Sequence, residues 1–360
     1  MTSGDPGAAA HPAPRIAVIG AGLAGLSCAL ALAAAGCAVT AFDKGRGPGG
    51  RLSTRRVDGP DGPFRFDHGG QYLSVRDPGF RAVMDGLVAA RTAARWEGRI
   101  VKLGADGAAE DSPAERFVGT PGVNAIVKAL ADALPDPVRW GVRVLPPERE
   151  GAGWRLRDEG GAALGRFDAV TIAAPAPQAA ALLAAASDLA ALAARARMAA
   201  CWAAMAVFDR PVETGWDAAF VTPAATGGDM LGWVAREASK PGRPAAEAWV
   251  LHGSPAWSDA QVELTPEVAA ARLLEAFRTA TGVEGPVSHL AAHRWRYALP
   301  AEPLGVGSLW DGTVRIGACG DWCVAPRAEA AFVSGRDLAG RMLAELGLPL
   351  KPAAPVSRAS

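Results

Sequence analysis

A glycine-rich turn between an apolar strand and an apolar helix constrains this chain more than any other feature. Residues 16–19 read as a short buried strand, Gly20-Ala21-Gly22-Leu23-Ala24-Gly25 follow, and an Ala/Leu-rich segment runs to about residue 35. The first glycine permits a tight turn, the second lets the backbone approach a pyrophosphate, and the third lets helix and strand pack closely. The pattern predicts a βαβ dinucleotide-binding unit and therefore an α/β fold.

Asp43 stands at the end of the next predicted strand, directly after residues 38–42, and lies 18 residues after Gly25. A carboxylate at this point can accept hydrogen bonds from the ribose hydroxyls of an adenosine, while the free N–H groups at the helix start face the phosphate charge. FAD and NAD enzymes share this opening. The turn and the acid together predict a dinucleotide without saying which one.

Overall composition narrows the range of partners. The chain has 37 basic and 37 acidic residues, so neither a nucleic-acid footprint nor a polybasic membrane patch is expected, and a small-molecule substrate is the default. Five scattered cysteines support neither a disulfide framework nor a zinc site, and no metal is expected.

Residues 1–14 lack the basic region of a signal peptide, and the glycines within the apolar run 16–39 argue against a membrane span. We expect a cytoplasmic protein.

The rest of the chain alternates helical and strand-like segments. Residues 178–197 are almost pure Ala and Leu and predict one helix, and residues 199–257 predict an antiparallel sheet of short strands rich in Trp, Val and Phe. Residues 76–116 show no clear period. Further helices are expected at 122–134, 266–281 and 329–346, and further strands at 138–145, 153–157, 167–173 and 314–318.

A second signature follows Asp43, with the sequence D-K-G-R-G-P-G-G-R-L-S-T over residues 43–54. Gly49 and Gly50 would allow backbone contact with a diphosphate, while Arg46 and Arg51 supply compensating charge. The segment resembles the second fingerprint of the amine-oxidase-like flavoproteins, an extension that NAD enzymes lack. The resemblance implies that the dinucleotide is FAD.

The segment 317–322, followed by a helix from about residue 329, resembles the C-terminal Gly-Asp signature of the same flavoproteins. The resemblance implies that Asp321 binds the ribityl chain or the diphosphate, and that the helix points its positive end at the flavin. It places no cysteine at the usual attachment position, so we expect FAD without a covalent bond. It also matches Val144 to a position whose backbone meets the adenine. The candidate cofactor residues are Gly20, Gly22, Leu23, Ala24, Gly25, Asp43, Lys44, Arg46, Gly50, Arg51, Leu52, Val144, Gly320 and Asp321.

Four further segments, residues 66–72, 231–243, 249–257 and 293–297, narrow the resemblance when taken together. The chain from about residue 15 to 340 is similar to bacterial renalase-like proteins. The resemblance implies a Rossmann-like FAD-binding domain with an inserted α+β substrate domain of the amine-oxidase/renalase type. It also implies an oxidase that converts isomeric dihydronicotinamides, 2- or 6-dihydro-NAD(P), by hydride transfer to flavin, with dioxygen as acceptor and hydrogen peroxide as product.

The implied domain organisation is discontinuous. Residues 15–75, 116–177 and 297–346 form the expected FAD-binding domain, residues 76–115 and 178–296 the substrate domain, and residues 1–14 and 347–360 loose tails.

Candidate catalytic residues come from the same segments. Gln71 and Tyr72 follow a glycine pair and are expected at the flavin edge, and His252 and Trp295 lie in the presumed substrate half. A planar ring needs flat apolar walls, and four tryptophans of this half are candidates, although most tryptophans are expected in the core. These four are Trp233, Trp249, Trp257 and Trp295.

Two alternatives remain open. The first is an FAD-dependent amine oxidase, or a related dehydrogenase, of the same fold, and the second is a flavin-bound protein without turnover. Related amine oxidases carry a lysine-held water beside the flavin. This chain has only five lysines, and Lys240 sits in a Pro/Gly turn where that role is hard to assign.

Overall fold

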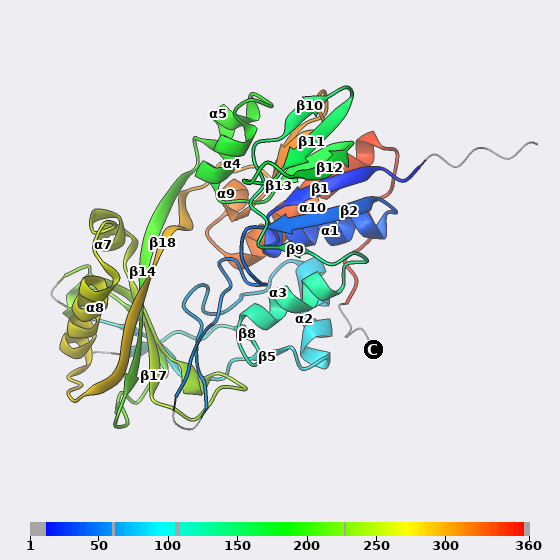
Figure 1. Ribbon diagram of the computed structural model, residues 1–360. Coiled ribbons are helices and arrows are strands. Elements are labelled where there is room, and N and C mark those ends of the chain that lie inside the picture. Colours follow the sequence, from blue (N-terminus) through cyan, green and yellow to red (C-terminus); the bar gives the residue numbers. More distant parts are fainter. Residues whose placement is uncertain (1–11, 60–61, 105–108, 227, 356–360) are drawn as a thin grey trace, which may run out of the picture.

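The computed structural model describes residues 12–59, 62–104, 109–226 and 228–355. Its cofactor-binding half is built on a mostly parallel six-stranded sheet (Figure 1), in which only β19 runs antiparallel to its neighbour. The strands in sheet order are β19 (Leu309–Asp311), β20 (Ile316–Ala318), β13 (Ala169–Ile172), β1 (Arg15–Ile19), β2 (Ala38–Asp43) and β9 (Arg139–Trp140). The predicted βαβ unit is confirmed as β1, α1 (Leu23–Ala34) and β2.

Both faces of this sheet are covered, which explains why its strands read as unbroken apolar runs. One face shares a hydrophobic core with α1, α2 (Pro78–Ala89), α3 (Asn124–Asp132) and α10 (Ala328–Glu345). The other packs against the small antiparallel sheet of β10 (Glu148–Glu150), β11 (Gly153–Arg157) and β12 (Ala163–Phe167), and against α4 (Ala176–Leu183) and α5 (Leu189–Ala193). Figure 1 shows the resulting layers.

The second half is a seven-stranded sheet whose longest strands are β14 and β18. Its strands in order are β18 (Val287–Glu302), β14 (Arg197–Phe208), β17 (Ala248–Gly253), β16 (Leu231–Arg236), β15 (Ala218–Val221), β6 (Ile100–Leu103) and β7 (Ala109–Asp111). All neighbours are antiparallel except β15 and β6. α7 (Pro255–Ala260) and α8 (Pro266–Thr281) lie on one side of it, and the other side faces the cofactor-binding half (Figure 1).

Short elements complete the fold. They are the hairpin β3 (Arg55–Val57) and β4 (Phe64–Phe66), the pair β5 (Ala93–Arg95) and β8 (Phe117–Gly119), α6 (Pro223–Thr226) beside α8, the 3-10 turn Glu237–Ser239, and α9 (Asp321–Val324). The architecture is thus the expected α/β fold with a Rossmann-like domain and a second, sheet-based domain. The domain boundaries remain a prediction. All of α2 and most of α4 were assigned to the substrate domain, although both helices share hydrophobic cores with the six-stranded sheet.

Three element predictions were wrong in detail. Residues 178–197 hold two helices, α4 and α5, because Ser187 interrupts the run: its Oγ bonds Asp311 Oδ2 at 2.7 Å and accepts from the N–H of Leu189. The segment 138–145 has only the two-residue β9, and Val144 makes an isolated bridge to Asp158. α2 was missed, although Asp77 caps it by accepting from the N–H of Phe80 at 2.8 Å.

No helix in the part of the chain that the structure describes is both long enough and apolar enough to cross a bilayer.

α1 and α10 cross in close contact. A Cβ at Gly335 of α10 would lie 2.1 Å from the carbonyl oxygen of Ala24, whereas one at Gly340 would meet only the end of the Leu350 side chain, at 3.3 Å. We expect Gly335→Ala to destabilise the protein by about 1–3 kcal/mol, because the helices must move apart. The matched Gly340→Ala change should be neutral or stabilising, since alanine favours helix by about 1 kcal/mol over glycine. Urea unfolding of both variants tests this, and equal effects would contradict the packing argument.

Candidate active site

The glycine turn has the geometry that a phosphate site needs. Gly20 has φ +104°, and a Cβ there would lie 2.7 Å from the carbonyl oxygen of Ala173. A Cβ at Gly25 would lie 1.9 Å from the carbonyl oxygen of Gly20, whereas one at Gly22 would meet nothing within 4 Å. The first and third glycines therefore close the turn, and the second leaves its outer side open.

The N-terminus of α1 opens at this turn without a side-chain cap, so its first N–H groups are available to a ligand. Asp43 holds the turn from β2: its Oδ2 accepts from the N–H of Ala21 at 2.7 Å, and its Oδ1 accepts from that of Gly45 at 2.6 Å. A carboxylate has further acceptor positions, so a ribose hydroxyl can still bind. Asp43 thus has a structural task that sequence reasoning did not assign to it.

Segments from opposite ends of the chain meet beside the turn. Gly50 has φ +55°, and a Cβ on it would lie 3.7 Å from Cα of Gly22. The next residue, Arg51, makes a two-pronged ion pair with Asp321, with N···O distances of 2.8 and 2.7 Å. The two residues are 270 positions apart in the sequence. The structure therefore joins two of the predicted cofactor motifs, and the direct pair between them was not foreseen.

The other predicted cofactor residues differ in their burial and in their hydrogen bonds. Lys44 donates to Gln178 Oε1 at 3.3 Å, Arg46 is exposed and makes no ion pair with any described residue, and Gly320 donates its N–H to Ser334 Oγ at 3.0 Å. Leu23, Ala24, Leu52 and Val144 are buried. Their contact with the cofactor remains a prediction.

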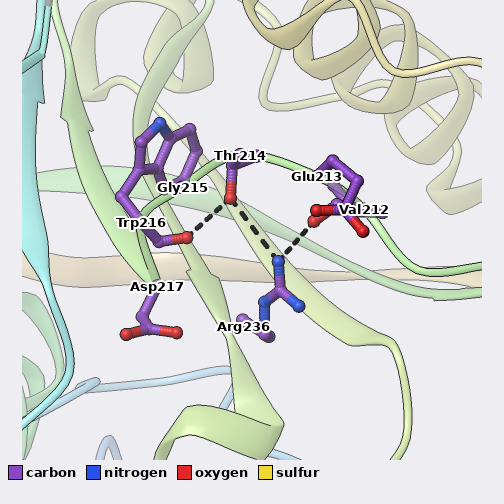
Figure 2. A pocket seen from close by; sticks show the side chains of 7 residues that line it. All are labelled: Val212, Glu213, Thr214, Gly215, Trp216, Asp217 and Arg236. Carbon is purple, nitrogen blue, oxygen red and sulfur yellow. Dashed lines mark hydrogen bonds between the residues drawn. The ribbon is translucent and has the colours of Figure 1, made fainter.

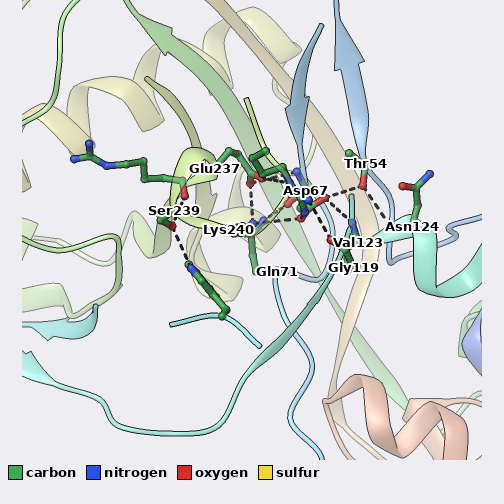
Figure 3. A network of polar contacts seen from close by, with 12 residues as sticks. Thr54, Asp67, Gln71, Gly119, Val123, Asn124, Glu237, Ser239 and Lys240 are labelled. Atoms are coloured by element: carbon green, nitrogen blue, oxygen red, sulfur yellow. Dashed lines mark hydrogen bonds and ion pairs between the residues drawn. The ribbon is translucent and has the colours of Figure 1, made fainter. Parts of the chain in front are cut away.

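A buried charge network lies where the loop after β4 meets the turn after β16 (Figure 3). Asp67 is fully buried and accepts from Thr54 Oγ1 at 2.7 Å and from the N–H of Val123 at 2.9 Å. It also pairs with Arg243 and, at 3.4 Å, with Lys240. The network therefore binds the two halves of the protein together.

Glu237 completes this network. It pairs with Lys240 at 2.8 Å and with Arg243 at 3.4 Å, so two acids face two bases with no net charge. Burial alone would raise the pKa of Asp67, but Lys240 and Arg243 outweigh it and hold that pKa below its usual value. Burial raises the pKa of Glu237, and the same bases offset this only in part.

Gln71 belongs to this network. Its Nε2 donates to the backbone oxygen of Asp67, and its Oε1 accepts from Lys240 Nζ at 3.0 Å. Lys240, which sequence reasoning could not place, is buried and bonded to three side chains. It therefore orients Gln71, whose role at the flavin edge remains a prediction.

Next to the network, three rings form a closed triangle. The ring centroids of His68 and His293 are 5.0 Å apart, those of His68 and Trp295 5.1 Å, and those of His293 and Trp295 4.5 Å. Trp295 Nε1 donates to the backbone oxygen of His68 at 2.8 Å. Of these rings, only Trp295 was predicted as a catalytic residue, although His68 stood inside the motif that follows β4.

The triangle continues into a row of residues across the large sheet. Strand register places Trp233, His252, Ala203 and His293 opposite one another on β16, β17, β14 and β18, so their side chains share one face. Tyr72 packs against Trp233, with ring centroids 5.5 Å apart. The structure thus brings the predicted Tyr72, His252 and Trp295 to the same side of the sheet.

The four candidate tryptophans fall into two pairs. Trp233 and Trp295 lie on this face, whereas Trp249 packs against Phe277 of α8, with ring centroids 5.1 Å apart, and Trp257 lies in the same outer core. Trp249 and Trp257 therefore support the sheet from behind and do not line the site.

Burial keeps the histidines of this face neutral. It lowers the pKa of His68 to about 3, with His293 and Arg55 adding to the effect, and it lowers the pKa of His252 to about 4. The pKa of His293 is lowered by burial and by Arg55. An added positive charge is unfavourable here.

A separate recess of about 220 Å³ lies at the loop 212–217 (Figure 2), and Trp216 of this loop packs against Trp249. Its arginine, Arg236, donates to the backbone oxygen of Val212 and pairs with Glu247 at 3.1 Å. The guanidinium therefore holds the loop, and the recess is separate from the cofactor motifs.

The residues around the glycine turn fit FAD. The open side of Gly22 and the uncapped start of α1 suit a diphosphate, and the exposed Arg46 offers positive charge beside it. The carboxylates of Asp43 and Asp321 have the acceptor chemistry that sugar and ribityl hydroxyls require, and their contact with the cofactor remains a prediction. Family models agree: residues 18–87 match an NAD(P)-binding Rossmann-like domain, and residues 101–328, more than half of the chain, match the flavin containing amine oxidoreductases.

The chain belongs to the flavin containing amine oxidoreductase family. Membership makes it an FAD-dependent oxidoreductase, with FAD as a non-covalent cofactor, and sets aside a flavin protein without turnover. Its five cysteines are all free and buried.

Solved structures show the same fold. A putative protoporphyrinogen oxidase from Exiguobacterium sp. has a TM-score of 0.74 at 14% identity, covering 93% of this chain and 99% of that one. Cyclohexylamine oxidase from Brevibacterium oxydans matches with a TM-score of 0.71 at 15% sequence identity, and the match covers 93% of this chain and 100% of that one. Wild-type putrescine oxidase bound to putrescine matches with a TM-score of 0.64 at 14% sequence identity, covering 92% of this chain and 99% of that one.

The open side of Gly22 yields a test of cofactor binding. We expect Gly22→Val to lower FAD occupancy about tenfold or more, because the new side chain would enter the space for the diphosphate, where a Cβ meets no protein atom within 4 Å. Ala34→Val, at the exposed far end of α1, controls for the effect of valine on the helix. Acid precipitation should release all bound FAD into the supernatant, where absorbance measures it. Full occupancy in Gly22→Val would refute the placement of the diphosphate.

The low pKa of His68 predicts how stability changes with pH. Unfolded histidine has a pKa of about 6.5, so as the pH falls below that value the unfolded chain gains a proton that native His68, with its pKa of about 3, does not. Stability is therefore lost as pH falls from about 6.5 towards 3, by roughly 2 kcal/mol at pH 5 from this residue. Urea unfolding of wild type and His68→Gln should show a smaller loss between pH 7.5 and 5 in the variant. Equal losses would exclude a neutral buried His68.

Proposed function

We propose that this protein oxidises isomeric dihydronicotinamides, 2- or 6-dihydro-NAD(P), in the manner of renalases. Bound FAD would supply the redox chemistry: it would take up the hydride of the dihydropyridine with one proton from solvent, and two electrons and two protons would then pass to dioxygen to give hydrogen peroxide. Residues of the glycine turn, Arg51 and Asp321 would hold the cofactor. The substrate half of the chain then has to bind the donor ring and orient it.

The observation that carries the proposal is the neutral aromatic face of the large sheet. The ring centroids of Trp295, His293 and His68 lie within 5.1 Å of one another, and Trp233 and Tyr72 extend the face. A flat ring gains contact area on such walls. A dihydropyridine needs only orientation, since its ring nitrogen lone pair drives hydride loss, and good orientation can be worth roughly 7–11 kcal/mol.

An amine makes different demands, because it must lose a proton and reach the site uncharged. Burial lowers the pKa of His68 and His252 to about 3 and about 4, which makes both rings weak bases at neutral pH. The nearby carboxylates, Asp67 and Glu237, are each paired with Lys240 and Arg243. The residues at this face therefore favour a neutral planar donor over an ammonium ion.

An amine oxidase is the competing function, favoured by the family and by the folds of cyclohexylamine and putrescine oxidases. Anaerobic stopped-flow reduction separates the two. We expect 2- and 6-dihydronicotinamide dinucleotides to bleach the flavin far faster than cyclohexylamine, putrescine or ordinary 4-dihydro-NAD, with peroxide formed when air is admitted. Fast bleaching by an amine together with none by the isomeric dihydropyridines would replace the proposal with the amine oxidase.

A matched pair of variants tests the aromatic face. Trp295→Phe keeps a ring but loses the hydrogen bond to the His68 backbone, worth about 1 kcal/mol, so flavin reduction should slow by about five- to tenfold. Trp257→Phe, on the outer side of the sheet, should reduce at the wild-type rate. Equal rates in the two variants would remove Trp295 from the site.

A further inference from the structure

Arg55 is a cation without an assigned partner at the end of the aromatic face. It pairs in register with Phe66 across the β3–β4 hairpin, and residues paired in this way project to the same side. Phe66 is fully buried against the large sheet, and its ring centroid lies 5.8 Å from that of His289 on β18. Arg55 therefore projects from the hairpin towards β18, and it contributes to the lowered pKa of both His289 and His293.

No side chain among the described residues neutralises this guanidinium. Arg55 is exposed and takes part in no ion pair or side-chain hydrogen bond there, unlike Arg51 and Arg243, which both pair with carboxylates. The described carboxylate nearest to it in sequence, Asp58, also makes no ion pair. The charge of Arg55 is thus available to a ligand.

A buried ring nitrogen points to the same conclusion. Nε2 of His289 is buried, yet it has no hydrogen-bond partner among the described residues. A buried polar atom without a partner costs about 1–3 kcal/mol, so such atoms mark places where a ligand completes the bonding. Neutral imidazoles can donate an N–H to an anionic oxygen beside an arginine.

We propose that Arg55 and His289 form a subsite for a phosphate group of the substrate, which makes the substrate a nucleotide and not a bare ring or an amine. The inference rests on the proposed function and names the part of the substrate that this end of the face binds. His289 and His293 share one face of β18 four residues apart, about 13 Å along the strand. That length accommodates a ribose and its phosphate beyond a ring held at His293 and Trp295.

The test compares two ligands that differ by one phosphate. Holoenzyme is titrated with oxidised nicotinamide mononucleotide and with nicotinamide riboside, and binding is followed by the change in the flavin absorbance spectrum. We expect wild type to prefer the mononucleotide by about tenfold, as one charge-assisted contact can provide, and the preference to shrink at high salt.

Variants assign the preference to Arg55. Arg55→Gln should remove it while leaving riboside affinity unchanged, and Arg55→Lys should retain part of it. Arg195→Gln, which removes another exposed arginine that makes no ion pair or side-chain hydrogen bond among the described residues, should keep the full preference. Equal affinities in wild type, no binding of either ligand, or an unchanged preference in Arg55→Gln would each overturn the subsite.

Measuring flavin reduction as well distinguishes failure of the phosphate subsite from failure of the proposed function. If the isomeric dihydronucleotides reduce the flavin but the phosphate preference is absent, the subsite is wrong and the function stands. If the preference is present but no dihydronicotinamide isomer reduces the flavin, the subsite stands as a nucleotide site and the proposed oxidation is wrong.

Discussion

The burial of Asp67 is the constraint on which the site depends. An ionised carboxylate away from water is costly unless charges and hydrogen bonds compensate it. Here the compensation comes from both halves of the protein, with Thr54 and Val123 on one side and Lys240 and Arg243 on the other. The loop that follows Asp67 carries His68, Gln71 and Tyr72, so the position of the candidate active site is set by satisfying one buried charge.

The same network explains why Lys240 differs from a free catalytic lysine. Its ammonium group is shared among Asp67, Glu237 and Gln71 and lies 5.5 Å from the ring centroid of Trp96. Removing either acid would leave a buried cation partly unpaired, which is far more costly than losing a surface ion pair. The positive charges of Lys240 and Arg243 are therefore neutralised by buried carboxylates, whereas that of Arg55 is not paired with any described carboxylate.

Much of the cofactor half could be predicted from sequence because local patterns determine it. Short motifs predict the local backbone geometry there: the turn Gly20–Gly25, the acid at Asp43 and the Gly-Asp segment at Asp321. The 266–281 helix was predicted with the limits it has in the structure for the same reason, since Thr265 and Pro266 mark its start and Gly282, with φ +69°, its end.

The substrate face could not be predicted in this way. Which tryptophans face the cofactor half depends on strand register, and Trp249 and Trp295 look alike in sequence although they lie on opposite sides of one sheet. The partners of Lys240 are likewise set by long-range folding, since Asp67 is 173 residues away. No local pattern encodes such contacts.

The pair between Arg51 and Asp321 also bears on the order in which the protein is made. A chain leaves the ribosome from its N-terminus, and domains tend to fold as they emerge. Here the first cofactor motifs are made before the substrate half, but β20, Asp321 and α10, which packs on α1, are made after it. The glycine turn and the apolar face of α1 therefore stay without these partners while the substrate half is synthesised, and FAD can be enclosed only after that.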